Sequence, residues 1–222
     1  MAITVSEIPV NFRGEGTGTA ELTWGQLTIW LAARQTGRTM NLVTPVPLPD
    51  GTPLDEMVAV LRFVVSRHPA LRTRLRFTDG HPWQFVAESG ELPLQIADIG
   101  DDEDPAAAAE ELRSRYELTP FDYENEFPVR MGVVRHSGAL RAMVAGFSHV
   151  MVDGAGLAAL IRDIEHMDEA TSTATARGLD PLELAQVQYG PAGRRQTGRS
   201  LRYWEAQLGK LNSWHNNEPA DP

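Results

Sequence analysis

The sequence predicts an α/β protein with a mixed β-sheet, because segments typical of strands are interspersed with segments typical of helices along the whole chain. The clearest strand is the run from Ala142 to Phe147, in which no polar side chain interrupts the apolar ones. The clearest helix follows directly, with apolar residues at the spacing of one helical face: Leu157, Leu160, Ile161 and Ile164. With 222 residues, of which 42% are hydrophobic, the chain is long enough for one domain with a substantial core.

The N-terminal half is expected to form strands around two helices. The expected strands cover residues 3–10, 41–48, 71–77, 83–87 and 92–96, with a turn at Asp79-Gly80 between the third and the fourth. One helix is expected over about 22–33. The other starts at Pro53, with Thr52 as its N-cap, and it ends before Pro69. The segment Gly14–Gly18 lacks the lysine and the strand-to-helix setting of a phosphate loop, so we interpret it as a flexible turn.

The C-terminal half is expected to contribute a hairpin and four helices. Asp104-Pro105 opens a helix that continues to about Tyr116. Strands at 129–135 and 140–147 flank Ser137-Gly138, which predicts a hairpin. Later helices are expected over 154–167, about 181–188 and 197–210. Residues 1–210 are therefore expected to form one lobe, and 211–222 a polar tail or a broken linker.

A pattern His-x-x-x-Asp-Gly follows the buried strand and consists of His149, Asp153 and Gly154. Each residue alone has an ordinary explanation, since a histidine can be a satisfied polar group and an Asp-Gly pair often starts a helix. Together, between a buried strand and an amphipathic helix, they favour a functional site on a rigid scaffold. Imidazole titrates near neutral pH, so His149 could accept a proton. The N–H of Gly154 at the helix start could donate to a developing oxyanion.

The segment Ser148–Gly154 resembles the His-His-x-x-x-Asp-Gly motif of nonribosomal peptide synthetase condensation domains, which belong to the chloramphenicol-acetyltransferase-like acyltransferases. Four other parts of the chain resemble further motifs in the family's order: Leu22–Trp30, Arg67–Thr73, Pro120–Asp122 with Phe127–Arg130, and Ser200–Trp204. The resemblance extends from about Leu22 to Leu208. It implies a mixed-sheet sandwich flanked by helices, which is the N-terminal lobe of a two-lobed fold. The second lobe has no counterpart in this sequence, so the lobe is expected to be excised or truncated.

The resemblance also implies a function. The complete protein would be an enzyme of nonribosomal peptide biosynthesis that forms an amide between an acyl or peptidyl donor and an aminoacyl acceptor. Both substrates would be tethered to the phosphopantetheine arms of carrier proteins, and no bound cofactor is expected. His149 would be a base or would hold the free amine, with Gly154 as oxyanion donor. Asp153 would shape the loop by pairing with Arg72, or with Arg67 as second choice.

Ser148 stands where the motif has its first histidine, a position that is mainly structural in the family. The lobe on its own is expected to be inactive, because its partners include the missing C-terminal lobe as well as the donor and acceptor carrier proteins.

Several alternatives share these residues. A coenzyme-A-dependent acyltransferase of the same superfamily would use the same histidine on a free substrate. A non-catalytic condensation-like module would only recruit partners. Epimerising relatives keep the motif, whereas heterocyclising relatives replace the histidine by aspartate. Residues Gly146–Val150 partly resemble the nucleophile elbow of α/β-hydrolases, but the final glycine is missing and His149 adjoins Ser148, which is poor geometry for a base and its nucleophile.

Composition excludes other classes of function. The formal net charge of −10 argues against nucleic acid as the main partner. The sequence shows no long apolar stretch and no signal peptide, so we expect a cytoplasmic protein that does not enter membranes. The absence of cysteine excludes a thiol nucleophile, and the six scattered histidines do not indicate a metal site. The tryptophans expected in the core are Trp24, Trp30, Trp83 and Trp204.

A local basic patch could dock an acidic carrier protein on this acidic chain. The candidate patch consists of Arg194, Arg195, Arg199 and Arg202. On the sequence alone, a solvated helix face is the favoured interpretation of these arginines.

Overall fold

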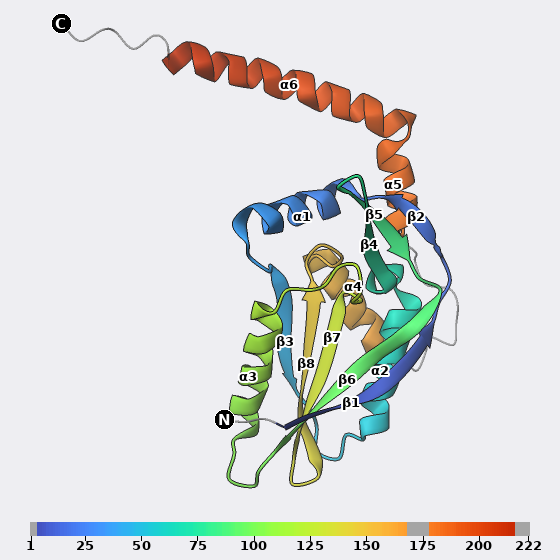
Figure 1. The fold of residues 1–222 in the computed structure, drawn as a ribbon, viewed down its shortest axis with the longest axis vertical. Helices are drawn as coiled ribbons and strands as arrows, with labels where there is room; N and C mark the ends of the chain where they lie inside the picture. The colour runs from blue at the N-terminus through green and yellow to red at the C-terminus, as the bar shows by residue number, and fades with distance from the viewer. Residues whose placement is uncertain (1–3, 168–177, 216–222) are drawn as a thin grey trace, which may run out of the picture.

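A computed structural model describes residues 4–167 and 178–215 of the chain. Its largest sheet has five strands in the order β1-β6-β7-β8-β3 (Figure 1). These strands are β1 (Thr4–Arg13), β6 (Ser89–Ile99), β7 (Val129–His136), β8 (Ala139–Ser148) and β3 (Asn41–Pro47). The strands β6 and β7 run parallel, and the other neighbouring pairs run antiparallel. The predicted α/β class with a mixed sheet is confirmed.

A second sheet of three antiparallel strands lies beside one end of the first, in the order β2-β5-β4. Its strands are β2 (Gly18–Glu21), β5 (His81–Val86) and β4 (Thr73–Thr78). The helices are α1 (Trp24–Thr36), α2 (Leu54–Arg67), α3 (Pro105–Leu118), α4 (Gly154–Glu165), α5 (Pro181–Tyr189) and α6 (Pro191–His215).

Helices cover both faces of the large sheet, with α3 on one face and α2 and α4 on the other (Figure 1). Successive side chains of a strand point to opposite faces, so Val133 packs in the core beneath α2 while Val134 packs beneath α3. The helix α1 lies across the end of the large sheet at which β8 finishes (Figure 1). This arrangement places the end of β8 under a helical cover.

Two hairpins have the loop chemistry that the sequence predicts. Asp79 and Gly80, between β4 and β5, have positive φ angles of 50° and 78°. Ser137 and Gly138, between β7 and β8, have φ angles of 49° and 77°. Two-residue loops with both residues in the left-handed region match the right-handed twist of the flanking strands, which favours Asp-Gly and related pairs there.

Several predicted helix and strand boundaries are wrong: the strand expected over 92–96 spans Ser89–Ile99, and no strand was expected at Gly18–Glu21. The N-cap of α2 is Pro53 and not Thr52, because the Thr52 hydroxyl donates a hydrogen bond to the Pro49 carbonyl in the preceding turn. The strand expected from Leu71 begins only at Thr73, since residues Pro69–Arg72 form a 3-10 turn. The last helix, expected over 197–210, starts at Pro191 and continues to His215. Part of the expected tail is therefore helical, and its residues 216–222 lie outside the described residues.

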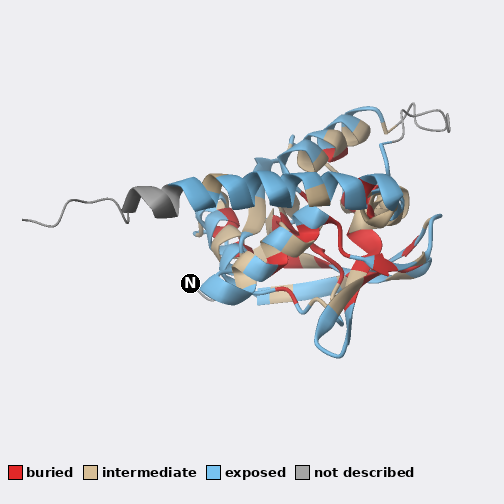
Figure 2. Cartoon of the chain, turned by 90° about the horizontal axis from the view of Figure 1, so that it is seen from above, coloured by how far each residue is buried: buried red, intermediate tan, exposed pale blue. Residues whose placement is uncertain are grey.

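The last helix differs from the rest of the protein in how far its residues are buried (Figure 2). Buried side chains gather between the sheet and the helices, whereas most residues of α6 from 191 to 210 are exposed. Of the tryptophans expected in the core, Trp30 is buried and Trp83 is half-buried. Trp24 and Trp204 are exposed, because they lie on the first turn of α1 and on α6. Within the described ranges, the structure contains no helix both long and apolar enough to cross a membrane.

Candidate active site

The candidate site is the turn that joins β8 to α4. The strand β8 ends at Ser148, whose carbonyl accepts hydrogen bonds from the N–H groups of Met151 and Val152 at 3.0 Å each. The helix α4 begins at Gly154. Since β8 lies between β7 and β3, the turn is mounted on the interior of the sheet. The predicted strand-to-helix setting of His149 is confirmed.

His149 is half-buried, and its ring is oriented by the turn itself. The Nδ1 atom lies 2.9 Å from the Val152 carbonyl oxygen. A carbonyl oxygen can only accept a hydrogen bond, so in the neutral ring Nδ1 carries the hydrogen and Nε2 carries the lone pair. This tautomer has the form that a general base, or an acceptor for an amine N–H, requires.

Asp153 and Gly154 start the following helix. The Asp153 carboxylate is exposed and accepts a hydrogen bond from the Gly156 N–H at 2.7 Å, which makes it the N-cap of α4. A Cβ atom added at Gly154 would meet no atom within 4 Å. A side chain at this position would thus point into open space, and the Gly154 N–H is among the first N–H groups of α4, which have no partner within the helix.

Ser148, one residue before the histidine, is buried and engaged in the turn. Its hydroxyl accepts a hydrogen bond from the Val150 N–H at 3.3 Å, and its own N–H donates to the Pro128 carbonyl at 3.1 Å. Burial raises the pKa of Tyr123, and a hydrogen bond with Ser148 opposes that rise. A buried hydroxyl held in this way does not resemble an exposed serine nucleophile.

The expected pair between Asp153 and Arg72 is wrong. Arg72 is 0% exposed, and its guanidinium donates to the backbone carbonyls of Ala87 and Glu15. Burial lowers the pKa of Arg72, and the negative charge of Asp180 opposes that change. Arg72 is held on the side of the β1–β2 loop, where Gly14 packs so closely that an added Cβ would lie 2.7 Å from the guanidinium carbon.

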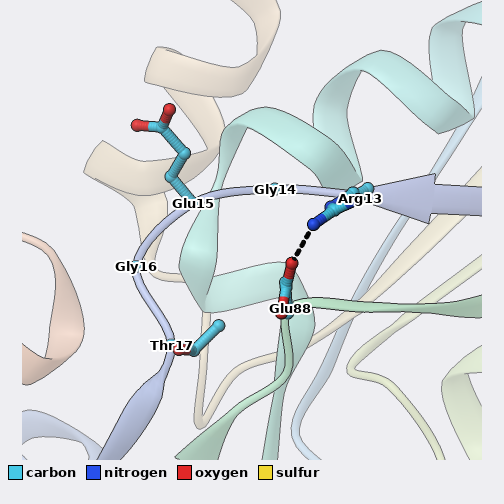
Figure 3. Close-up of a pocket in the computed structure, with 6 residues that line it drawn as sticks. All are labelled: Arg13, Gly14, Glu15, Gly16, Thr17 and Glu88. Carbon is cyan, nitrogen blue, oxygen red and sulfur yellow. Dashed lines mark hydrogen bonds and ion pairs between the residues drawn. The ribbon is translucent and has the colours of Figure 1, made fainter.

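The β1–β2 loop, which we interpreted as a flexible turn, borders a surface groove (Figure 3). Arg13 and Glu88 form an ion pair across it. The residues that line the groove are Arg13, Gly14, Glu15, Gly16, Thr17 and Glu88. None of them belongs to the turn that carries His149, so this groove is separate from the candidate site.

The second-choice partner, Arg67, pairs with a residue that the sequence did not identify. Its Nε lies 2.5 Å from Oδ2 of Asp163 on α4, and Nε2 of His68 lies 3.1 Å from the same oxygen. Burial lowers the pKa of His68, while the negative charge of Asp163 opposes this. The carboxylate thus joins the end of α2 to the helix that Asp153 and Gly154 begin.

Two buried glutamines, Gln26 and Gln84, also support the turn, and no sequence pattern marked the second of them. Gln26 Nε2 donates to Oε1 of Gln84 at 3.2 Å and approaches the sulfur of Met151 at 3.3 Å. Gln84 Nε2 donates to the carbonyls of Glu21 and Pro181 at 2.9 Å each. Met151 lies between His149 and Asp153 in the turn. The glutamines therefore connect the turn to α1, to the small sheet and to the first residue of α5.

We expect Gln84→Leu to disturb the environment of His149, because Gln26 would lose the acceptor that orients it toward Met151. The matched control is Gln95→Leu, which removes the acceptor of the Tyr116 hydroxyl (2.8 Å) on β6 of the large sheet. Each variant should lose on the order of 1–3 kcal/mol of unfolding free energy through an unpaired buried group. The His149 ring resonances in NMR spectra should move in the first variant only. Identical His149 resonances in wild type and Gln84→Leu would contradict this supporting role.

The separation of Arg72 from Asp153 predicts additive effects on stability. Arg72→Leu should lower the unfolding free energy by on the order of 3 kcal/mol, since two carbonyls lose a charged donor. Asp153→Ala should cost about 1 kcal/mol through the lost N-cap. In a double-mutant cycle followed by chemical denaturation, the two losses should add within about 0.5 kcal/mol. A coupling energy well above that value would show that Asp153 and Arg72 do interact, as the sequence predicted.

Within the ranges that the structure describes, no three His, Cys, Asp or Glu side chains gather in a way that could hold a metal ion. The site consists instead of an imidazole with a fixed tautomer beside the N-terminus of a helix. That combination can take up a proton and stabilise negative charge on a neighbouring oxygen.

Comparison with known proteins agrees with these observations. The family model described as the condensation domain matches residues 20–215. Phosphinothricin tripeptide synthetase PhsB of Streptomyces viridochromogenes is 29% identical over 221 residues, which are 97% of this chain and 18% of that protein. Bacitracin synthase 2 of Bacillus licheniformis is 24% identical over 179 residues, which are 81% of this chain and 6% of that protein.

Solved structures share the fold. The starter condensation domain of rhizomide synthetase RzmA matches with a TM-score of 0.65 and 19% identity, over 86% of this chain and 50% of that chain. The X-domain from teicoplanin biosynthesis matches with a TM-score of 0.58 and 21% identity, over 94% of this chain and 42% of that chain. The chain therefore spans about half the length of these structures and a small part of the synthetases.

Proposed function

The chain belongs to the condensation-domain family, and from that premise we propose that it is the N-terminal half of an acyltransferase that forms amide bonds in nonribosomal peptide biosynthesis. The observation that carries the proposal is the orientation of the His149 ring. Its Nδ1 lies against the Val152 carbonyl, so in the neutral ring the lone pair is on Nε2, and the positive end of α4 begins five residues further on.

In the proposed reaction, the amine of an aminoacyl acceptor attacks the thioester carbon of an acyl or peptidyl donor. The His149 Nε2 takes the amine proton or holds the free amine in position. The Gly154 N–H donates to the oxygen that becomes negative in the tetrahedral intermediate. When the intermediate collapses, the C–N bond remains and the C–S bond breaks. The donor thiolate then takes up a proton. Asp153 fixes the start of α4 as its N-cap.

The substrates would arrive on the phosphopantetheine arms of donor and acceptor carrier proteins, so the protein itself needs no bound cofactor for this chemistry. The solved relatives are about twice as long as this chain. We therefore propose that a second half completes the cleft in which His149 acts. The exposed apolar side chains of α6 are the proposed surface for this second half.

The test is a reconstituted condensation assay. The chain would be combined with the second half, an acyl-loaded donor carrier and an aminoacyl-loaded acceptor carrier. Intact-protein mass spectrometry should find the amide product on the acceptor carrier. Acyl transfer from coenzyme A to a free amine, without a product on the carrier, would favour the coenzyme-A-dependent alternative. Binding of carriers without either product would favour a recruitment module.

A further inference from the structure

The helix α6 projects from the rest of the protein and makes few contacts with it. It spans Pro191–His215 and extends beyond α1, away from both sheets (Figure 1). Among the described elements, α5 is the one that α6 contacts extensively. Most of its side chains are thus free to meet another molecule, and their arrangement around the helix shows which kind of molecule fits.

Two different faces run along α6. At about 100° per residue, Leu201, Trp204 and Leu208 fall within roughly 60° of one another. Their exposed fractions are 59%, 60% and 56%. The arginines of the opposite face also fall within roughly 60° of one another. They are Arg195, Arg199 and Arg202, and all are exposed. Helix geometry thus separates an apolar face from an arginine face, which can serve different partners.

The arginine face lies in a positively charged segment of an otherwise acidic protein. Residues 191–210 contain five basic side chains and a single acidic one, Glu205, so this stretch carries +4. The whole chain has a formal charge of −10, and the remainder therefore carries −14. Within the described residues, the structure gives Arg195, Arg199 and Arg202 no ion-pair partner. Their charge is not neutralised within the body of the protein.

We propose that the arginine face of α6 docks an acidic carrier protein, while the apolar face packs against the second half of the domain. This inference rests on the proposed function, since that function requires carriers to deliver the substrates. An acidic protein is repelled by most of this chain, but charges are screened beyond about 8–10 Å in physiological salt. A helix of 25 residues is roughly 37 Å long, so the field near its arginines is local and attractive. Charge complementarity of this kind steers encounter and selects the acidic partner.

The test uses two triple variants with the same change in charge. One reverses the arginine face with Arg195→Glu, Arg199→Glu and Arg202→Glu. The control reverses three exposed arginines of the body with Arg38→Glu, Arg62→Glu and Arg162→Glu. The probe is a fluorescently labelled holo peptidyl carrier protein of net negative charge, and its binding is followed by fluorescence anisotropy in 50 and 300 mM salt.

We expect the Kd of the face variant to rise at least tenfold in low salt and that of the control variant to stay within about twofold of wild type. High salt should remove most of the difference. Equal losses in both variants would show that net charge, and not this face, governs binding. An unchanged Kd in the face variant, or no binding by wild type, would leave α6 with an ordinary solvated face and overturn the proposal.

A second readout separates docking from chemistry. Soluble pantetheine thioesters need no carrier, so the reconstituted enzyme should turn them over equally well with wild-type and face-variant chains. Carrier binding through α6 without any amide product would contradict the proposed function and leave the docking surface intact. Carrier-dependent turnover that is unaffected by the face variant would overturn the docking surface and leave the proposed function intact.

Discussion

Replacing His149 by alanine is expected to lower amide formation by the reconstituted enzyme by roughly 10²–10⁴-fold, the range supplied by a positioned acid-base group. The fold should survive, because the ring is half-buried and its side-chain hydrogen bond is local, to the Val152 carbonyl three residues away. The rate would be measured with loaded donor and acceptor carriers, and the fold by circular dichroism and thermal unfolding.

The matched control is His166→Ala. His166 also bonds a nearby carbonyl through Nδ1, that of Arg162 at 2.7 Å, but it is exposed beyond the far end of α4. Its loss should leave the rate within about twofold of wild type. If His149→Ala formed product as fast as the control, the proposed role of the histidine would be wrong.

The chain without a second half is expected to fold and yet give no measurable condensation. Helices of the chain itself cover both faces of the large sheet, so the apolar side chains of each face are buried without a second half. Positioning the two substrates is a different requirement, and it can supply roughly 7–11 kcal/mol of a bimolecular barrier. Without the second half, no residues would position the two substrates beside His149 and the N-terminus of α4.

This expectation is checked with the purified chain and both loaded carriers, with and without the separately expressed second half. Product should form when both halves are present. The same preparation of the chain should unfold cooperatively, which shows that the loss is not one of folding. Turnover by the chain alone at the rate of the two halves together would refute the two-lobe site.

The parts of the fold that were predictable from the sequence are those with local signals. The left-handed pairs Asp79-Gly80 and Ser137-Gly138 fix hairpins within two residues. Asp104 caps α3 through the Ala106 N–H, two residues away. The strand, turn and helix around His149 are contiguous in the chain, so their order follows from hydrophobic pattern alone.

The supports of the site were not predictable, because they join distant segments. Arg67 and Asp163 are 96 residues apart, and Gln26 and Gln84 are 58 residues apart. Arg72 was assigned a carboxylate, but it binds backbone carbonyls, which every residue possesses and no sequence pattern marks. The start of α6 was missed because the helix is exposed almost all round, so no burial pattern sets its first residue.

The edge strand β1 has a consequence for how the protein assembles in time. The hairpin of β7 and β8 closes over two residues, whereas the paired residues of β1 and β6 are 76 to 94 positions apart in the sequence, from the Arg13–Ser89 pair to the Thr4–Asp98 pair. The entropy lost on closing a loop grows with its length, so distant pairings form slowly and after local ones. The strands β1 and β3 are the two edges of the five-stranded sheet, and each has one neighbouring strand only. The pairs of β3 with β8 lie further apart still, from 95 positions for Pro47–Ala142 to 107 for Asn41–Ser148. Both edge ladders are therefore expected to form after the β7–β8 hairpin and to fray before it.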